Sequence, residues 1–345
     1  MSFVTALVID VDDEGKPSIY LEVFRPFRSE SDSTGRGQHL IYHSVGENLY
    51  EALRLVELNS SQQLNFTQNK AIIFSKKAAE KGIDNYIDIL NRNQQFLLRQ
   101  FLFVTNGDAS KFLDTELKEE EYIGLFLADI SLIREDYAKV HTIRIDDYLN
   151  RRLIGSEVVL IPIIEIVSTS FDNKISLSGA AVIQNDKYKD FLNIGESREY
   201  NIMMNIARKG MLDIEYKDTG IFMAFEISKS KADTNLTYDG ETIYLNKKVN
   251  MKLSFGETQK PLDIDNEVTL TKIKENVEEK LSEEMKKLFE KWKKKGVDIF
   301  EIKRTFEIEY PTTKLDVNNI LEITELKLEL NVEIEGSTDV IDFVD

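Results

Sequence analysis

Apolar and polar residues alternate regularly near both ends of the chain. Residues 4–11 and 18–25 are strand-like and flank the turn-forming sequence DDEGKP, which predicts a β-hairpin. Near the C-terminus the apolar residues at every second position are Leu326, Leu328, Leu330, Val332 and Ile334. This period of two is typical of a strand with one buried and one solvated face. Leu321 and Ile323 have the opposite phase, so we expect a β-bulge around residues 324–325.

A spacing of three and four residues predicts a long helix from about residue 267 to residue 295. Its apolar stripe consists of Leu270, Ile273, Val277, Leu281, Met285, Leu288 and Trp292. Asp265 or Asn266 can cap the helix and Gly296 can end it. A partner could bind such a stripe, but the stripe of a long helix usually packs on the protein's own sheet, and we interpret it as core.

Shorter periodic segments predict further helices and strands. We expect helices from near Gly46 through Val56 and at residues 116–132, 145–153 and 195–208. We expect strands at residues 38–44, 158–167, 177–183, 187–192, 221–228 and 243–255. Because helices and hairpins are mixed without regular strand–helix repeats, the fold class is expected to be α+β.

Several positions add detail to these elements. Pro162 lacks an amide hydrogen, which indicates an edge position or a bulge in its strand. Asn185 and Asp186 form a two-residue hairpin turn between two strands. The polar residues 229–240 are expected to separate two strands, and residues 298–310 fit either a strand or a helix.

Residues 69–107 have the order of a strand–helix–strand unit, which raises the question of a nucleotide site. A strand at residues 71–74 leads into a helix that ends at Gly82 and restarts with Asp84 as its N-cap. A phosphate loop needs glycines directly after the strand, whereas this chain has SKKAAEK there. We therefore interpret the unit as structural.

Composition narrows the possible function classes. A length of 345 residues corresponds to roughly two or three domains. The net charge of −17 argues against a nucleic-acid partner, because phosphate binding depends on lysine and arginine. The absence of cysteine excludes thiol catalysis, disulfides and cysteine-bound metals. The longest apolar run, residues 158–164, is too short to cross a bilayer, and no leader precedes the first strand.

No residue of the chain presents a convincing catalytic, cofactor-binding or metal-binding pattern. The sequence contains no Walker loop and no complete dinucleotide fingerprint. His39 and His43 have the spacing of a helical zinc pair, but on a strand they would lie roughly 13 Å apart. His141 has no serine elbow nearby. The acidic clusters at residues 12–13, 119–121 and 146–147 are expected to be solvated turns or helix faces.

Several stretches, taken in order, resemble one known family. They are ALVIDVDDEGKPSIYLEVFRP with Ile9, Asp10 and Pro26, the run from VGENLYEAL to FLLR with Glu51, Ala52, Ala79, Gly82, Ile83, Arg92 and Arg99, then VVLIPIIEI, LSGAAVIQNDKYKDFLNIGES and KKGVDIFEI. This pattern is similar to the Ger(x)C lipoprotein family, the C subunits of nutrient germinant receptors in spore-forming bacteria. The chain departs from the family pattern at Val8, at Gln68 and in lacking tryptophans around residues 312–321. The family carries a signal peptide and a lipidated cysteine just upstream of its first strand, and this sequence starts where such a mature domain would start, so we expect it to be the soluble part of a protein whose anchor lies upstream.

The resemblance implies a non-enzymatic ectodomain without cofactor or metal. It implies three mixed α/β domains of antiparallel or mixed sheets with packed helices, which we assign to residues 1–145, 146–240 and 241–345. Residues 298–310 would then form a second C-terminal helix.

The resemblance also implies where the protein acts and with what. A lipid anchor would hold it at the outer face of the spore's inner membrane, and its partners would be the integral-membrane A and B subunits in receptor assembly and germination signalling. The sequence identifies neither the nutrient nor the interface residues. The alternative is a soluble small-molecule-binding protein, or an enzyme, with a site between domains.

Overall fold

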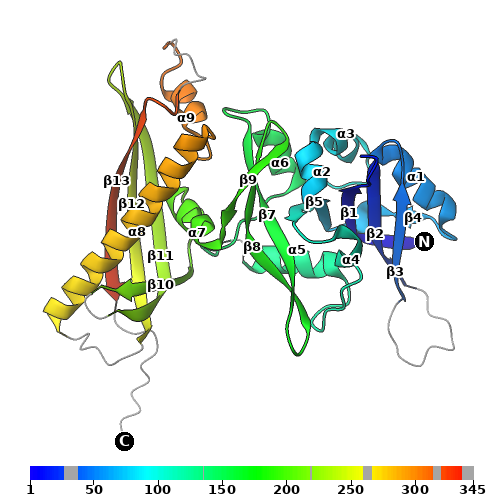
Figure 1. The fold of residues 1–345 in the computed structure, drawn as a ribbon, viewed down its shortest axis with the longest axis horizontal. Coiled ribbons are helices and arrows are strands. Elements are labelled where there is room, and N and C mark those ends of the chain that lie inside the picture. The colour runs from blue at the N-terminus through cyan, green and yellow to red at the C-terminus, as the bar shows by residue number, and fades with distance from the viewer. Residues whose placement is uncertain (27–37, 135, 218–219, 259–265, 314–319, 336–345) are drawn as a thin grey trace, which may run out of the picture. The chain divides into compact units, whose positions relative to one another are not determined.

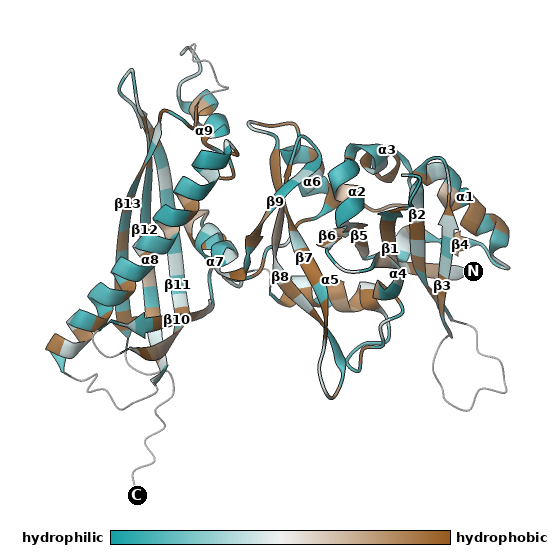
Figure 2. Ribbon diagram, in the orientation of Figure 1, coloured by the Kyte–Doolittle hydropathy of each residue, from teal (hydrophilic) through white to brown (hydrophobic). Residues whose placement is uncertain are grey.

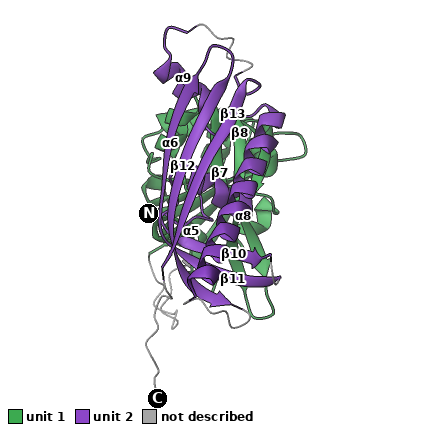
Figure 3. Ribbon diagram, turned by 90° about the vertical axis from the view of Figure 1, so that its left-hand side faces the viewer, with its two compact units in different colours: residues 1–135, 142–192 green, residues 136–141, 193–345 purple. Residues whose placement is uncertain are grey.

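A computed structural model describes residues 1–26, 38–134, 136–217, 220–258, 266–313 and 320–335. The chain forms two compact units, which Figure 3 shows in different colours. Unit 1 contains residues 1–135 and 142–192, and unit 2 contains residues 136–141 and 193–345. The division into three domains remains a prediction. Among the described residues, no helix has the length and apolar character required to cross a membrane.

Unit 1 is built on a nine-stranded mixed sheet with the order β3-β2-β1-β5-β6-β7-β8-β9, in which β4 also pairs with β1. The strands are β1 (Ser2–Val11), β2 (Pro17–Arg25), β3 (Gln38–Val45), β4 (Leu64–Asn65), β5 (Ala71–Ser75), β6 (Phe101–Thr105), β7 (Val158–Ser168), β8 (Asn173–Gln184) and β9 (Lys187–Asn193). Strands β1, β5, β6 and β7 run parallel, while β2, β3 and β8 pair antiparallel. The hairpin predicted at the N-terminus is confirmed.

Helices cover both faces of this sheet. They are α1 (Leu49–Asn59), the 3-10 turn η1 (Phe66–Gln68), α2 (Lys76–Lys81), α3 (Asp84–Arg92), α4 (Ala109–Phe112), α5 (Ile123–Ile133) and α6 (Ile145–Arg151). Neighbouring residues of β1 point to opposite faces, so Leu7 joins one core with α1, α2, α3 and α6, and Val8 joins another with α4 and α5. Figure 2 shows apolar residues concentrated in the strands around β5.

The segment of residues 69–107 is the predicted strand–helix–strand unit, since β5 and β6 are parallel and joined through α2 and α3. The Ser75 hydroxyl accepts the Ala78 amide hydrogen at the start of α2, and Gly82 ends that helix at φ 133°. The prediction that Asp84 caps α3 is wrong, because Asp84 is the first helical residue and follows Ile83, which has helical dihedral angles.

The β7–β9 region confirms two details of the sequence. The β7–β8 ladder shifts register between Ile163 and Ile164, next to Pro162, which fits the predicted bulge. Asn185 and Asp186 form the hairpin turn with φ of 50° and 60°. The carbonyl of Asp186 accepts the Ile83 amide hydrogen at 2.7 Å, so the hairpin turn is tied to the start of α3.

Unit 2 has a four-stranded sheet with the order β10-β11-β12-β13. The strands are β10 (Gly210–Tyr216), β11 (Ile221–Tyr238), β12 (Ile243–Thr258) and β13 (Thr324–Glu335), and the helices are α7 (Ile194–Met203), α8 (Glu267–Lys295) and α9 (Ile302–Glu309). The long helix α8 packs on the sheet and on α7 (Figure 1). Trp292 has no exposed surface, which confirms that the stripe of α8 is core. A second C-terminal helix is also confirmed, although it covers only Ile302–Glu309 of the expected residues 298–310.

Several elements differ from the expectation. Strand β11 continues through most of the polar segment 229–240, because its exposed face takes the charged residues while Ala232 and Leu236 face inward. Helix α7 ends at Met203 because the Asn201 carbonyl accepts two amide hydrogens from the following turn. The bulge expected at residues 324–325 is wrong, because both residues lie in the regular start of β13, whereas Leu321 and Ile323 belong to the turn before it. Helix α5 begins at Ile123 rather than near residue 116.

Residues 136–141, here called the crossing segment, belong to unit 2 although the residues on both sides belong to unit 1. Tyr137 forms a parallel bridge with Lys209, beside the start of β10. The side-chain amide of Asn201 donates to the carbonyls of Ala138 and Val140 at 2.9 and 2.7 Å. This buried asparagine therefore fastens the crossing segment to α7.

Candidate functional site

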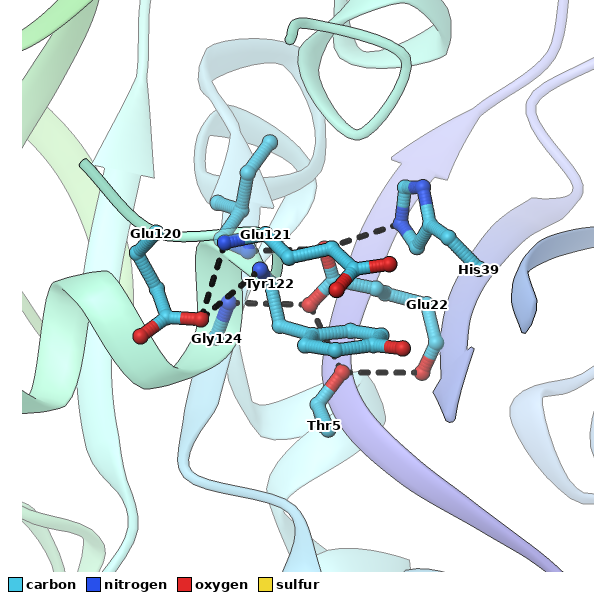
Figure 4. A network of polar contacts seen from close by, with 8 residues as sticks. Thr5, Glu22, His39, Glu120, Glu121, Tyr122 and Gly124 are labelled. Carbon is cyan, nitrogen blue, oxygen red and sulfur yellow. Dashed lines mark hydrogen bonds and ion pairs between the residues drawn. The ribbon is translucent and has the colours of Figure 1, made fainter. Parts of the chain in front are cut away.

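Among the described residues of unit 1, the most enclosed charged side chain is Glu22 on β2, which has no exposed surface (Figure 4). Its Oε1 accepts the Ile123 amide hydrogen at 2.7 Å, and its Oε2 accepts the Gly124 amide hydrogen at 2.9 Å. The Thr5 hydroxyl donates to Oε2 at 2.6 Å, and Nε2 of His39 lies 3.2 Å from Oε1. Glu22, Thr5, His39, Ile123 and Gly124 are called the Glu22 cluster below.

The Glu22 cluster supplies the N-terminal cap that helix α5 lacks locally. Tyr122 stands at the cap position without a capping hydrogen bond from its side chain. The first amide hydrogens of a helix carry partial positive charge, so a carboxylate at this end is favourable. The helix can approach β1 and β2 this closely because residue 124 is glycine, where a Cβ would lie 2.1 Å from the Thr5 carbonyl oxygen.

Replacing Gly124 by alanine is expected to lower the free energy of unfolding by about 1–3 kcal/mol, because the added methyl group overlaps the β1 backbone. Chemical denaturation of both proteins measures the difference. Gly107→Ala is the matched control, since a Cβ there meets only the Thr105 hydroxyl at 3.6 Å. Equal stability of the two variants would contradict the close-approach argument.

His39 on β3 forms the rim of the Glu22 cluster, with 29% of its side chain exposed. The hydrogen bond to Glu22 raises the pKa of His39 above its ordinary value, although burial opposes this. The Tyr122 ring lies edge-on to the imidazole with centroids 5.5 Å apart, and burial raises the pKa of Tyr122 to about 12. His39 is therefore the group of this cluster most easily titrated near neutral pH.

The contribution of His39 to stability is expected to fall as pH rises. Because its folded-state pKa is raised above the unfolded value of 6.5, the contribution is fully present below pH 6.5 and is lost as pH passes the raised pKa. The measurement is the free energy of unfolding against pH for the wild type and for His39→Gln. His43→Gln serves as the control, since His43 contacts a hydroxyl. Parallel curves for the wild type and His39→Gln would contradict the assignment.

The two histidines of the considered zinc pair have separate partners. His43 lies 3.0 Å from the Ser18 hydroxyl and stacks on Tyr20 with centroids 4.5 Å apart, whereas His39 contacts Glu22. The described residues contain no group of three or more histidine, aspartate or glutamate side chains placed to hold a metal. His141 is buried beside the Tyr200 ring, with centroids 6.2 Å apart.

The acidic clusters noted in the sequence support local backbone structure. Asp12 accepts the amide hydrogens of Glu14 and Lys16 in the first hairpin turn. Glu120 accepts the amide hydrogen of Glu121 before α5, and Asp146 lies in the first turn of α6. The structure does not bring these three clusters together into one site.

Unit 2 contains a second polar cluster between α7 and α8. Arg198 donates to Glu199 through Nε at 2.8 Å and to Glu284 through Nη2 at 2.8 Å. Burial raises the pKa of Glu199 to about 7, although the Arg198 charge opposes this. Lys291 pairs with Glu196 at 2.6 Å. These ion pairs join the two helices.

Lys247 on β12 is the most buried lysine side chain that the structure describes, and burial lowers its pKa to about 8. Its ammonium group donates to the Met203 carbonyl at the end of α7 and to the Thr234 hydroxyl. Sequence reasoning missed Lys247 and Glu22. In both cases a charged residue occupies a position where the alternation of the strand predicts an apolar one. Lys247 lies on the same face of its strand as the apolar residues, and Glu22 lies on the same face as Tyr20 and Phe24.

The geometry of the Glu22 cluster is that of a structural lock. The carboxylate has no exposed surface, and it contacts groups from three separate parts of the chain. These contacts fix the start of α5 against β1 and β2.

Models of two protein domains match the chain in consecutive order. A model described as the spore germination protein N-terminal domain matches residues 1–166. A model described as spore germination B3/GerAC like, C-terminal, matches residues 178–338. Together they cover both units.

Individual relatives agree with these matches. Spore germination protein GerQC of Bacillus cereus is 20% identical over 265 residues, which are 76% of this chain and 73% of the relative. Spore germination protein KC of Bacillus subtilis (strain 168) is 20% identical over 333 residues, 90% of this chain and 82% of the relative. The fold is similar to the crystal structure of the GerBC protein, with a TM-score of 0.57 and 18% identity over 95% of this chain and 96% of that one. Since both domain models match in order and the relatives align over most of the sequence, the chain belongs to the Ger(x)C family of spore germination proteins.

Proposed function

We propose that this protein is the C subunit of a nutrient germinant receptor and acts with the integral-membrane A and B subunits in receptor assembly and germination signalling. The ordered match of both family domains is the observation that carries the proposal. Members of this family are not known as enzymes, and the Glu22 cluster has the geometry of a structural lock. We further propose that a lipid anchor holds the protein at the outer face of the spore's inner membrane.

The genomic context of the full-length gene provides the first test. The proposal expects a leader with a lipobox cysteine upstream of the first strand, and neighbouring genes for two membrane proteins. Spores that lack the gene are expected to lose the response to one class of nutrient. A gene without these neighbours, whose deletion leaves every nutrient response intact, would overturn the proposal.

Biochemical isolation provides the second test. An affinity-tagged protein solubilised from spore membranes is expected to co-purify with the A and B subunits. Calorimetry of the purified chain against amino acids, sugars and nucleotides is expected to give no saturable heat, because the proposed role is assembly rather than ligand capture. A saturable heat, without co-purifying membrane proteins, would favour a small-molecule-binding protein instead.

A further inference from the structure

Strand β13 forms one edge of the unit 2 sheet and pairs with β12 on one side. The Ile323 carbonyl accepts the Ile243 amide hydrogen at 2.9 Å, so odd-numbered residues here direct their backbone groups toward β12. In a parallel ladder the alternate residues direct theirs away. The backbone groups of the even-numbered residues of β13 therefore face the open edge.

Helix α8 covers this edge at two points. The Glu278 carboxylate accepts the Val332 amide hydrogen at 2.8 Å, and the Lys293 ammonium donates to the Thr324 carbonyl at 2.7 Å. Fifteen helical residues span roughly 22 Å, and eight strand residues span about 26 Å. The helix therefore runs along most of β13 in the opposite direction, as Figure 1 shows, and its two side chains act as clamps near the ends of the strand.

Between the clamps lie Leu326, Leu328 and Leu330. Their side chains are half-buried, and within the described residues their outward amide and carbonyl groups have no hydrogen-bond partner. An edge of this kind, with apolar side chains and unpaired backbone groups, is a template for another strand. Because Glu278 and Lys293 bond to Val332 and Thr324, only the template residues 326–330 remain available for pairing with another strand.

The sequence of this template complements itself. An antiparallel pairing of two copies centred on Leu328 places Leu326 of one copy opposite Leu330 of the other. It also places Lys327 of one copy opposite Glu329 of the other, twice by symmetry. Opposite charges and apolar pairs at directly facing positions stabilise antiparallel strands. The clamped residues, Thr324 and Val332, are equally distant from Leu328 and would face each other.

We propose that the β13 edge is a surface for association between copies of this chain, and that Glu278 and Lys293 keep it closed. The accessible template has five residues on each copy, so the clamped protein is expected to associate only weakly through this edge. Release of both clamps extends the pairing to residues 324–332 of each copy and joins two sheets into one.

Removal of the clamps in the full chain tests the proposal. The double variant Glu278→Ala, Lys293→Ala is expected to self-associate at least about tenfold more tightly than the wild type in sedimentation equilibrium, a change of 1.4 kcal/mol. Glu283→Ala, Lys287→Ala is the matched control, because it removes an exposed ion pair of the same charges from the same helix. A folded double variant that stays as monomeric as the control would overturn the proposal.

A charge exchange tests the register. In the clamp-free protein, Lys327→Glu places two glutamates opposite each other and is expected to abolish association, whereas Lys327→Glu with Glu329→Lys is expected to restore it. Circular dichroism checks folding, and the single clamp variants are measured if the double variant does not fold. Association that is insensitive to Lys327→Glu would show a different interface and overturn the assignment.

Discussion

Replacing Glu22 by alanine is expected to lower the free energy of unfolding by about 3–5 kcal/mol, because buried donors lose their shared acceptor. The amide hydrogens of Ile123 and Gly124 would remain buried without a partner, and the Thr5 hydroxyl would keep only its 3.3 Å hydrogen bond to the backbone carbonyl of residue 22. Chemical denaturation followed by circular dichroism measures the loss. Hydrogen exchange should locate it at the start of α5.

Glu22→Gln is the matched control for this prediction. It keeps the volume of the side chain but removes the charge and turns one acceptor oxygen into a donor group. We expect a smaller loss than for alanine, since one oxygen still accepts hydrogen bonds. A loss below about 1 kcal/mol for Glu22→Ala would mean that the cap of α5 is dispensable.

Replacing Asn201 by leucine is expected to lower the free energy of unfolding of unit 2 by about 2–6 kcal/mol. The variant leaves the carbonyls of Ala138 and Val140 without their donor, at about 1–3 kcal/mol each. Trp292 is the only tryptophan of the chain and lies in unit 2, so its fluorescence reports this transition.

Asn235→Leu serves as the control for the Asn201 variant, because it makes the same chemical change at an exposed position of β11. Its stability is expected to stay within about 0.5 kcal/mol of the wild type. If Asn201→Leu behaved like this control, the crossing segment would not depend on the asparagine.

Elements with strong local signals could be predicted from the sequence. The stripe of α8 and the cap residues Asn266 and Gly296 define that helix without reference to the rest of the chain. The start of α5 could not be found this way, because its cap is Glu22, which lies 101 residues before Ile123. A contact across that distance leaves no pattern near the helix itself.

The polar part of β11 was missed for a related reason. Its inward positions carry small or polar residues such as Ser230 and Ala232, so hydropathy alternates weakly although the strand continues. The contacts of Glu278 and Lys293 with β13 could not be predicted from the sequence either. They form only when the fold brings helix α8 next to the edge strand. The sequence could exclude thiol catalysis, disulfides and cysteine-bound metals, but it could not show which side chains far apart in the chain contact each other.

The crossing segment also delays part of the folding of unit 2 during synthesis. Ala138 leaves the ribosome 71 residues before Lys209, the residue whose carbonyl accepts its amide hydrogen. At about 5–20 residues per second, this delay lasts roughly 4–14 s. During that time α6, β7, β8, β9 and α7 are synthesised, while residues 136–141 lack a binding partner that has not been translated.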